Sequence, residues 1–412
     1  MTTALFPSTI AAQAAQRFEQ LGWPTPRQEE WKYTNVAPIT KINWKSGGQA
    51  PSPVQGQAGA PDLHMPLALV ELVFVNGVFV SRTGDGAKGL KVARLAEEQN
   101  EKLAKYADYQ DHPFTALNTA NAHDGALIIA DAGVAIEGFI HILYLGSGDE
   151  VWSHPRNLIL AGRGSQLTVV ETYAGEGRYF TNAVTEIVAE DGAVVDHYKL
   201  ECESPFAYHV GTIQIHQERS SNVTARSVAI GGALVRNEVN AALKGEGSSL
   251  ALEGLFIGTN TQHIDNKTVI DHARPHCEST ELYKGILDGN SRGVFDGRVI
   301  VGVGAQKTVA RQTNKNLLLS ETAIIDSKPT LEIHNDDVKC NHGSTIGQLA
   351  EEPLFYLRSR GIGEEEARGL LIFAFASEIV DRMKIEPVRE AIRRVMFQQM
   401  RDRIPERRGG TR

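Results

Sequence analysis

The sequence contains little cysteine: only Cys202, Cys277 and Cys340 occur among its 412 residues. No two of them are close enough in sequence to make a CxxC pair, so a disulfide framework is not expected. Three thiols also fall short of the four that an all-cysteine zinc site or an ordinary iron–sulfur cluster needs. Any such site would need ligands from a partner.

Long apolar runs are also missing. No stretch of about 18 apolar residues occurs, and the first residues have neither a basic n-region nor an apolar h-region. We therefore expect a cytoplasmic protein with no membrane partner. The formal net charge of −8 and the pI near 5.9 argue against a nucleic-acid partner, because nucleic-acid-binding proteins present a basic surface. Small molecules or other proteins are the expected partners.

Self-contained catalytic motifs are absent as well. No HExxH helix is predicted, and no GxSxG or GxGxxG motif is predicted between a strand and a helix. The stretch GVGAQKT at Gly302–Thr308 lacks the GxxxxGK[ST] spacing with which backbone amides surround a phosphate. We interpret it as a turn, and we expect a protein that is not an enzyme.

The length exceeds the roughly 250–300 residues at which one globular core stops growing. Several structural units or one elongated fold are therefore expected. Residues 46–62 are rich in Gly, Pro, Ser and Gln and poor in apolar residues, which predicts a loop or linker.

The N-terminal region, residues 1–123, is expected to be mainly helical. The apolar spacing of residues 8–21 predicts an amphipathic helix with Ser8 as its N-cap. Further elements expected in this region are a strand at 69–80 and helices at 92–107 and 112–122.

Residues 124–345 differ in composition: short runs of Val, Ile, Leu and Thr are separated by Gly, Ser and Asn. This pattern predicts strands and turns. Similar turn-then-apolar phrases begin at Gly164, Gly192, Ser220 and Gly247, which are 28, 28 and 27 residues apart, and another begins at Gly304. A fixed period without long helices indicates a parallel β-solenoid, or β-helix, whose coils stack. A two-sheet sandwich is the structural alternative.

The C-terminal region, residues 346–412, is expected to be helical. One helix is predicted near Gln348–Arg358, and another begins after Gly363 at three consecutive glutamates that favour a helix N-terminus. The predicted fold class is therefore mainly β, with a β-helix core flanked by helical regions.

Cys340 and His342 are the main candidate site residues. If residues 334–342 are extended, His334, Asp336 and Val338 project to the same side as these two. Cys340 and His342 could then handle a metal ion or sulfur. The alternative is a buried thiol beside a hydrogen-bonded imidazole, since free cysteine is among the most buried residue types.

A second group, His272, His276 and Cys277, is a weaker candidate for a metal site. His276 and Cys277 are adjacent and would point to opposite faces of a strand. One of these two is expected to lie in the core.

Three blocks of the sequence resemble the SufB/SufD family of SUF-system iron–sulfur cluster assembly proteins. They are RQEEWKYTNV at 27–36, LYKGILDG with GVFDGRVIVGVGAQKTVARQTNKNLLLS at 282–320, and KPTLEIHNDDVKCNHGSTIGQL with FYLRSRGI at 328–362. The likeness extends over essentially the whole chain and is closer to the SufD branch than to the SufB branch. It implies a right-handed parallel β-helix between N-terminal and C-terminal helical regions.

The resemblance also implies partners and a site. It implies a complex with a SufB-like scaffold paralogue, joined through the β-helix ends, and with two copies of a SufC-like ABC-type ATPase. Nascent cluster assembly at that junction falls on His342 and, secondarily, Cys340, as metal ligands of a transient iron–sulfur cluster or iron shared with the partner. The isolated chain is expected to bind no cofactor. The implied ATPase-docking residues are Leu354, Phe355, Tyr356, Leu357, Arg358, Arg360 and Gly361.

Three functions remain open from the sequence. The first is a non-catalytic scaffold subunit in cluster assembly. The second is a β-helix enzyme acting on carbohydrate, for which an export signal and paired carboxylates would be expected. The third is a purely structural adaptor in which Cys340 and His342 only pack. Exposed solenoid edges also predict homodimers when the partner is absent.

Overall fold

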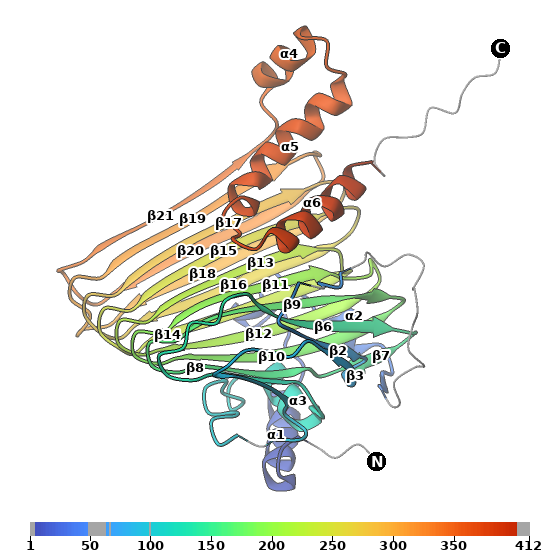
Figure 1. Cartoon of the computed structure of the whole chain (residues 1–412). Helices are drawn as coiled ribbons and strands as arrows, with labels where there is room; N and C mark the ends of the chain where they lie inside the picture. Colours follow the sequence, from blue (N-terminus) through green and yellow to red (C-terminus); the bar gives the residue numbers. More distant parts are fainter. Residues whose placement is uncertain (1–4, 48–62, 66, 99, 402–412) are drawn as a thin grey trace.

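The fold was analysed in a computed structural model, which describes residues 5–47, 63–65, 67–98 and 100–401. Two sheets face each other and form a parallel β-solenoid of about 8 turns, with helices near both ends of the chain (Figure 1). The predicted fold class is therefore confirmed. The predicted linker, apart from residues 46 and 47, lies outside the described residues.

Among the described residues, three helices precede the strands, one lies between the fourth and fifth strands along the chain, and three follow the last strand. The helices are α1 (Ser8–Leu21), the 3-10 helix η1 (Glu29–Trp31), α2 (Ala37–Thr40), α3 (Pro113–Asn121), α4 (Glu351–Ser359), α5 (Glu364–Val380) and α6 (Glu386–Arg401).

Among the described residues, one sheet has 11 strands and the other has 10. The first contains β1 (Lys45–Ser46), β4 (Leu90–Arg94), β5 (Ala126–Ala130), β7 (Val151–Ser153), β8 (Arg156–Ala161), β10 (Tyr179–Ala189), β12 (Tyr208–Gln217), β14 (Leu234–Leu243), β16 (His263–His272), β18 (Arg292–Val301) and β20 (Ile324–Ile333). The second contains β2 (Val70–Val75), β3 (Val78–Thr83), β6 (Ile140–Ser147), β9 (Gln166–Glu176), β11 (Val194–Cys202), β13 (Asn222–Ile230), β15 (Ser249–Gly258), β17 (Glu278–Leu287), β19 (Val309–Leu318) and β21 (Lys339–Gly347).

The repeat seen in the sequence is a stacked turn. Gly164, Gly192, Ser220 and Gly247 all have left-handed backbone conformations, with φ between 54° and 71°. The backbone N–H of each donates to a carbonyl in the next coil, as from Gly164 to Asp191 at 2.8 Å. Glycine recurs there because it adopts positive φ without steric cost. The next two coils place His276 and Lys307 at this position, with φ of 60° for both, which is why the glycine pattern fades there.

The N-terminal region contains more strand than predicted. The prediction of a helix at 92–107 was wrong, because residues 90–94 form β4 and the residues after it form turns. The strand predicted at 69–80 is a hairpin of β2 and β3 with a left-handed turn at Asn76 and Gly77. β2 and β4 extend the two solenoid sheets, so the sheets begin before residue 124. The division of the chain into three domains stays a prediction.

Helix α1 matches its predicted bounds, but Ser8 is its first helical residue and Pro7 occupies the N-cap. Farther along, Trp31 packs against the first sheet. The Arg236 guanidinium lies 3.8 Å from the Trp31 ring centroid and donates a hydrogen bond of 3.0 Å to the Glu30 carbonyl. Arg236 also forms ion pairs with Glu238 and Asp265. The 27–36 segment is therefore packed on the solenoid.

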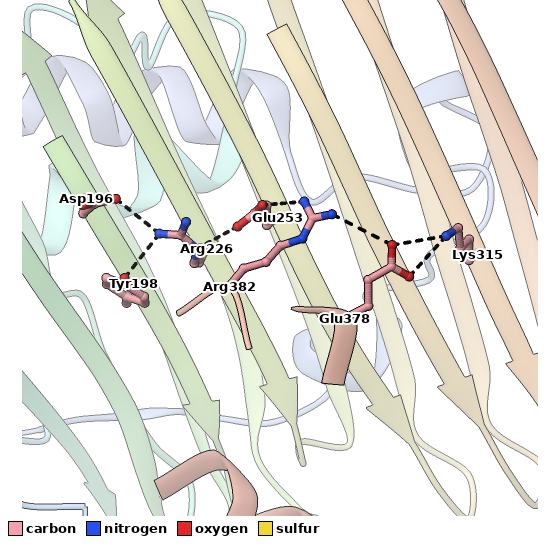
Figure 2. A network of polar contacts seen from close by, with 7 residues as sticks. All are labelled: Asp196, Tyr198, Arg226, Glu253, Lys315, Glu378 and Arg382. Atoms are coloured by element: carbon pink, nitrogen blue, oxygen red, sulfur yellow. Dashed lines mark hydrogen bonds and ion pairs between the residues drawn. The ribbon is translucent and has the colours of Figure 1, made fainter. Parts of the chain in front are cut away.

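The C-terminal helices α5 and α6 cover the outer face of the second sheet (Figure 1). Apolar residues of these helices, including Ile379 and Val388, share a buried cluster with outward residues of the strands, including Tyr198 and Val228. A polar strip crosses the same face, in which Glu253 binds Arg226 at 2.7 Å and Arg382 at 2.8 Å (Figure 2). At the end of this strip, Glu378 binds Lys315 at 3.1 Å (Figure 2).

Candidate functional site

The last coil of the solenoid leaves both sheets with a bare edge. β20 and β21 are the terminal strands of their sheets, and each pairs with a neighbouring strand on one side only. Three large apolar side chains on them are exposed, namely Ile324 at 53%, Ile333 at 42% and Ile346 at 55%. A strand edge with unpaired N–H and C=O groups is a template for pairing with another chain. This surface is the open end.

Cys340 and His342 lie together at the open end. Both belong to β21, where they are in register with Ala310 and Gln312 of β19. Ala310 and Gln312 are buried and face the solenoid interior, so Cys340 and His342 face the same way, above the last closed layer. The structure thus brings the two predicted residues to one face.

The wider set predicted on this face is only partly present. His334, Asp336 and Val338 lie in the loop between β20 and β21 and not in a strand. The predicted strand alternation was therefore wrong for this loop, where the chain turns from one sheet to the other, although Val338 packs against the same core cluster as Cys340. The strand instead adds Ser344, whose hydroxyl lies 2.8 Å from that of Ser327 on β20.

The two candidate residues differ in burial. Cys340 is half-buried and packs against the main core cluster, whereas His342 is exposed. Burial raises the pKa of the Cys340 thiol, against the opposing effect of a backbone hydrogen bond with Ala310. In the isolated chain Cys340 is therefore a neutral thiol and a poor nucleophile. His342 is the residue that is freely accessible to an incoming ligand or partner.

Directly beneath this layer is a buried polar pair that the sequence analysis missed. Gln312 and Glu281 are 1% and 3% exposed, and the Gln312 Nε2 donates a hydrogen bond of 2.7 Å to Glu281 Oε2. Burial raises the pKa of Glu281 to about 7. Strand alternation within each repeat predicts which positions face inward, but it does not show which inward positions of adjacent coils are neighbours, as Glu281, Gln312 and His342 are.

A larger polar cluster fills the interior of the middle coils. Glu171 accepts hydrogen bonds from Tyr173, Thr185 and His197, at 2.8 to 3.0 Å. Next to it, Lys199 lies 3.0 Å from both Glu201 and His209. All of these side chains are buried, and their mutual bonds offset the cost of removing them from water. This cluster is closed on every side by neighbouring coils.

The second predicted cluster does not converge. His272 is buried with its Nε2 2.8 Å from the Ser279 hydroxyl, and Cys277 is fully buried with its Sγ 3.3 Å from the Ser248 hydroxyl. His276 is exposed in a turn, 4.0 Å from Glu246. Cys277 is thus the core residue of the adjacent pair, and the three side chains do not share a site.

The motif-like sequences are turns between strands. Residues 302–307 form a turn, as predicted. In this turn Lys307 forms an ion pair with Asp337 at 2.8 Å. The sequence GNSRG at 289–293 fits GxSxG, and GDGAKG at 84–89 fits GxGxxG, but each connects two strands and not a strand and a helix. Ser291 is buried and donates to the Gly258 carbonyl, so it cannot act as an exposed nucleophile.

The predicted ATPase-docking residues lie on α4 and in the turn after it. α4 contains no buried residue, and Phe355 and Tyr356 are 74% and 57% exposed. The Arg360 guanidinium lies 5.2 Å from the Tyr356 ring centroid. Leu354 and Leu357 are half-buried, whereas Arg358 and Gly361 are exposed. Figure 1 shows α4 projecting beyond the solenoid. Aromatic and arginine side chains of this kind are typical of binding hot spots.

Metal binding and membrane insertion each need a particular arrangement of side chains. Within that part of the chain, no group of three or more His, Cys, Asp or Glu side chains is arranged to hold a metal ion. Cys340 and His342 are thus two potential ligands and not a complete site. None of the described helices has the length and apolar character needed to span a membrane.

Comparisons with known proteins agree with the fold. Residues 144–375 match the model of the SUF system FeS cluster assembly, SufBD core domain, and residues 8–142 match that of the SufBD protein N-terminal region. The chain is 32% identical over 389 residues to the iron–sulfur cluster assembly protein SufD of Escherichia coli, which covers 92% of this chain and 90% of that protein.

Two further relatives are similarly close. The SufBD family protein slr0076 of Synechocystis is 33% identical, over 92% of this chain and 88% of its own length. The chloroplastic protein ABCI7 of Arabidopsis thaliana is 30% identical, over 93% of this chain and 84% of its own. The core-domain model covers more than half of the chain and, like all three relatives, extends along most of the solenoid, so the chain belongs to the SufBD family of SUF-system iron–sulfur cluster assembly proteins.

Proposed function

We propose that this chain is a cytoplasmic, non-catalytic scaffold subunit of a SUF iron–sulfur cluster assembly complex. It pairs with a SufB-like paralogue through the open end and binds a SufC-like ATPase through α4. The observation that carries the proposal is the bare edge of β20 and β21 with Cys340 and His342 on its inner face. In a member of this family, that arrangement offers both a surface for strand pairing and ligands for the assembled cluster.

Strand pairing is supported by the form of the open end. β20 and β21 have 10 and 9 residues, and their outer edges have no strand neighbour among the described residues. A partner strand added there would satisfy backbone groups and cover the exposed Ile324, Ile333 and Ile346. Homodimers of the isolated chain would use the same edge.

Cluster assembly at this junction is supported by the chemistry of the two side chains. A thiolate and a neutral imidazole are good ligands for iron, which is a substrate of the scaffold here and not a resident cofactor. Cys340 and His342 supply two ligands, so the partner supplies the remainder. His342 has the primary role because it is exposed, whereas Cys340 is half-buried.

The partner contacts are tested by co-expressing the chain with its SufB-like and SufC-like partners and measuring subunit stoichiometry by native mass spectrometry. Ile346→Glu places a charge on the inner face of the open end and is expected to remove the paralogue but keep the ATPase. Val303→Glu is the matched control, because Val303 is 78% exposed in a turn outside the open end. Unchanged paralogue binding in Ile346→Glu would contradict pairing at this edge.

ATPase docking is tested in the same assay. Phe355→Asp and Tyr356→Asp are expected to remove the ATPase but keep the paralogue, since both rings are exposed on α4. Phe206→Asp is the control, because Phe206 is 62% exposed in the turn between β11 and β12. Equal loss of ATPase in all three variants, or no loss in either α4 variant, would contradict docking on α4.

A further inference from the structure

Three polar side chains form a column that ends at the open end. Glu281 on β17, Gln312 on β19 and His342 on β21 are consecutive partners in the strand register. In-register neighbours on parallel strands lie about 4.8 Å apart, so each side chain in this inward-facing column is within reach of the next. His342 is the exposed member, and the other two are buried.

The orientation of the Gln312 amide is fixed by its surroundings. Its Nε2 donates to Glu281 Oε2 at 2.7 Å. The amide also fits against Gly297 of the opposite sheet, where a Cβ atom would overlap Gln312 Nε2. With the nitrogen held in this way, Gln312 Oε1 remains as an acceptor. This oxygen is buried and has no hydrogen-bond partner among the described residues.

We propose that Gln312 and Glu281 are positioning residues for His342. The structure does not contain this bond; in the proposed arrangement the exposed His342 side chain turns inward, and Gln312 Oε1 accepts a hydrogen bond from one of its ring N–H groups. Glu281 holds the amide in the orientation that presents this oxygen. The second ring nitrogen of His342 then keeps its lone pair directed out of the open end, where iron or a cluster would bind. The inference rests on the proposed role of His342 as a ligand.

The physical basis is the need of a ligating histidine for a defined tautomer. A neutral imidazole has one N–H and one lone pair, and the hydrogen bond made by the N–H decides which nitrogen is free to bind metal. Metal-ligating histidines almost always donate this N–H to a carbonyl, carboxylate or water, and loss of that partner typically lowers metal affinity or activity about 10- to 100-fold. A buried amide oxygen without a donor, directly below an exposed histidine, provides this partner.

An alternative partner for the Gln312 oxygen is present in the interior. The buried Thr268 hydroxyl on β16 interacts with Glu281 and is in register with Gly297, against which the Gln312 amide packs, and a water molecule could join it to Gln312. If such a bond replaced the one to His342, changes at Gln312 would leave the His342 ring unaffected. The experiment must therefore observe His342 directly.

The test is a two-bond ¹H–¹⁵N correlation spectrum of the isolated full-length chain labelled with ¹⁵N-histidine and held at pH 8. The His342 signals are identified by their loss in His342→Gln. The wild-type protein is expected to show a single His342 tautomer. Gln312→Leu removes the acceptor, and Gly297→Ala displaces the amide but keeps all three column residues, so both are expected to give a mixture of tautomers.

Asn316→Leu is the matched control, because Asn316 is another buried inward residue of β19 but lies beneath Ile346. It should leave the single tautomer intact. The signals of buried His272, whose Nε2 is 2.8 Å from Ser279, report whether each variant is folded. A tautomer mixture in the wild type, or a single tautomer retained in folded Gln312→Leu and Gly297→Ala, would overturn the inference.

A second measurement separates this inference from the proposed function. In the complete complex, Gln312→Leu is expected to lower the yield of assembled cluster about tenfold or more at unchanged subunit stoichiometry, whereas Asn316→Leu is not. If His342→Ala leaves the yield unchanged although Gln312→Leu alters the tautomer, the column exists but the proposed role of His342 is wrong. If His342→Ala abolishes the yield and Gln312→Leu changes neither yield nor tautomer, the proposed function stands and the column does not.

Discussion

Inward-facing strand positions differ between the middle coils, where they are covered and structural, and the open end, where they are available to a partner. His197 and Lys199 on β11 and His342 and Ser344 on β21 all face inward, and the strand register links His197 to His342 through the coils between them. His197 is fully buried and bonded to Glu171, whereas His342 is exposed. The difference arises because a further coil covers His197, whereas none of the described coils covers His342. An inward polar residue is structural when a coil covers it and is available to a partner when none does.

The largest effect on stability is expected where the interior is fully closed. Glu171→Ala leaves the buried Tyr173 hydroxyl, Thr185 hydroxyl and His197 ring without their shared acceptor. Each unsatisfied group costs about 1–3 kcal/mol, so we expect a loss of about 3–5 kcal/mol of stability. Thermal unfolding followed by circular dichroism measures it. Glu137→Ala, at an exposed position, should change little, and an equally small effect at Glu171 would contradict a structural role for the closed cluster.

The next prediction concerns the pH dependence of folding stability. Burial raises the pKa of Glu203 to about 8, assisted by the nearby Glu201 charge and opposed by the Tyr179 hydrogen bond. Because the folded-state pKa lies above the ordinary value of 4.5, the stability contributed by protonated Glu203 is complete below about pH 4.5 and is lost as the pH rises towards 8. Glu203→Gln keeps the neutral form at every pH.

We therefore expect Glu203→Gln to gain stability relative to the wild type as the pH rises from about 5 to about 8. Unfolding temperatures of both proteins across this range measure the effect. The same comparison with Glu137→Gln, at an exposed position, should show a constant difference. A constant difference for Glu203 as well would mean that the residue titrates as it would in water.

A smaller effect is expected on the outer face of the same strands. Arg382 follows the end of α5, and its side chain is 46% exposed. Its guanidinium forms an ion pair with Glu253 at 2.8 Å, which ties the end of the helix to the sheet (Figure 2). Solvent screening limits such a contact to about 1 kcal/mol or less, so Arg382→Ala should lower the unfolding temperature slightly and less at high salt. Arg358→Ala, which breaks an exposed pair with Glu364 at 3.3 Å, is the control away from the sheet. A large, salt-independent loss would show that the strip governs docking of the C-terminal helices.

The solenoid could be predicted from the sequence because the residues of its turns recur at a fixed spacing. Gly164, Gly192 and Gly247 occupy a position that requires positive φ, and glycine favours it. The helix predicted at 92–107 failed because β4 is stabilised by pairing with β5, a contact between distant residues that local spacing does not reveal. In the same way, Cys340 and His342 could be chosen from the sequence, but Gln312 and Glu281 could not. Their role depends on the register between neighbouring coils, which pairs Glu281 with Gln312 and Gln312 with His342.

The smallest effect on stability is expected at the open end, where the functional effect should be largest. His342 is exposed, so His342→Ala should change stability by no more than about 0.5 kcal/mol. In the complete complex it should nevertheless lower the yield of assembled cluster, measured by iron and sulfide content and by absorption, because a ligand at the junction is lost. His276→Ala is the matched control, since His276 is also an exposed histidine but lies in a turn. If His342→Ala lowered the stability but left the cluster yield unchanged, His342 would be a packing residue and the open end would have only a structural role. Loss of yield in an equally stable protein would show that removing one coil's cover is enough to turn a structural position into a functional one.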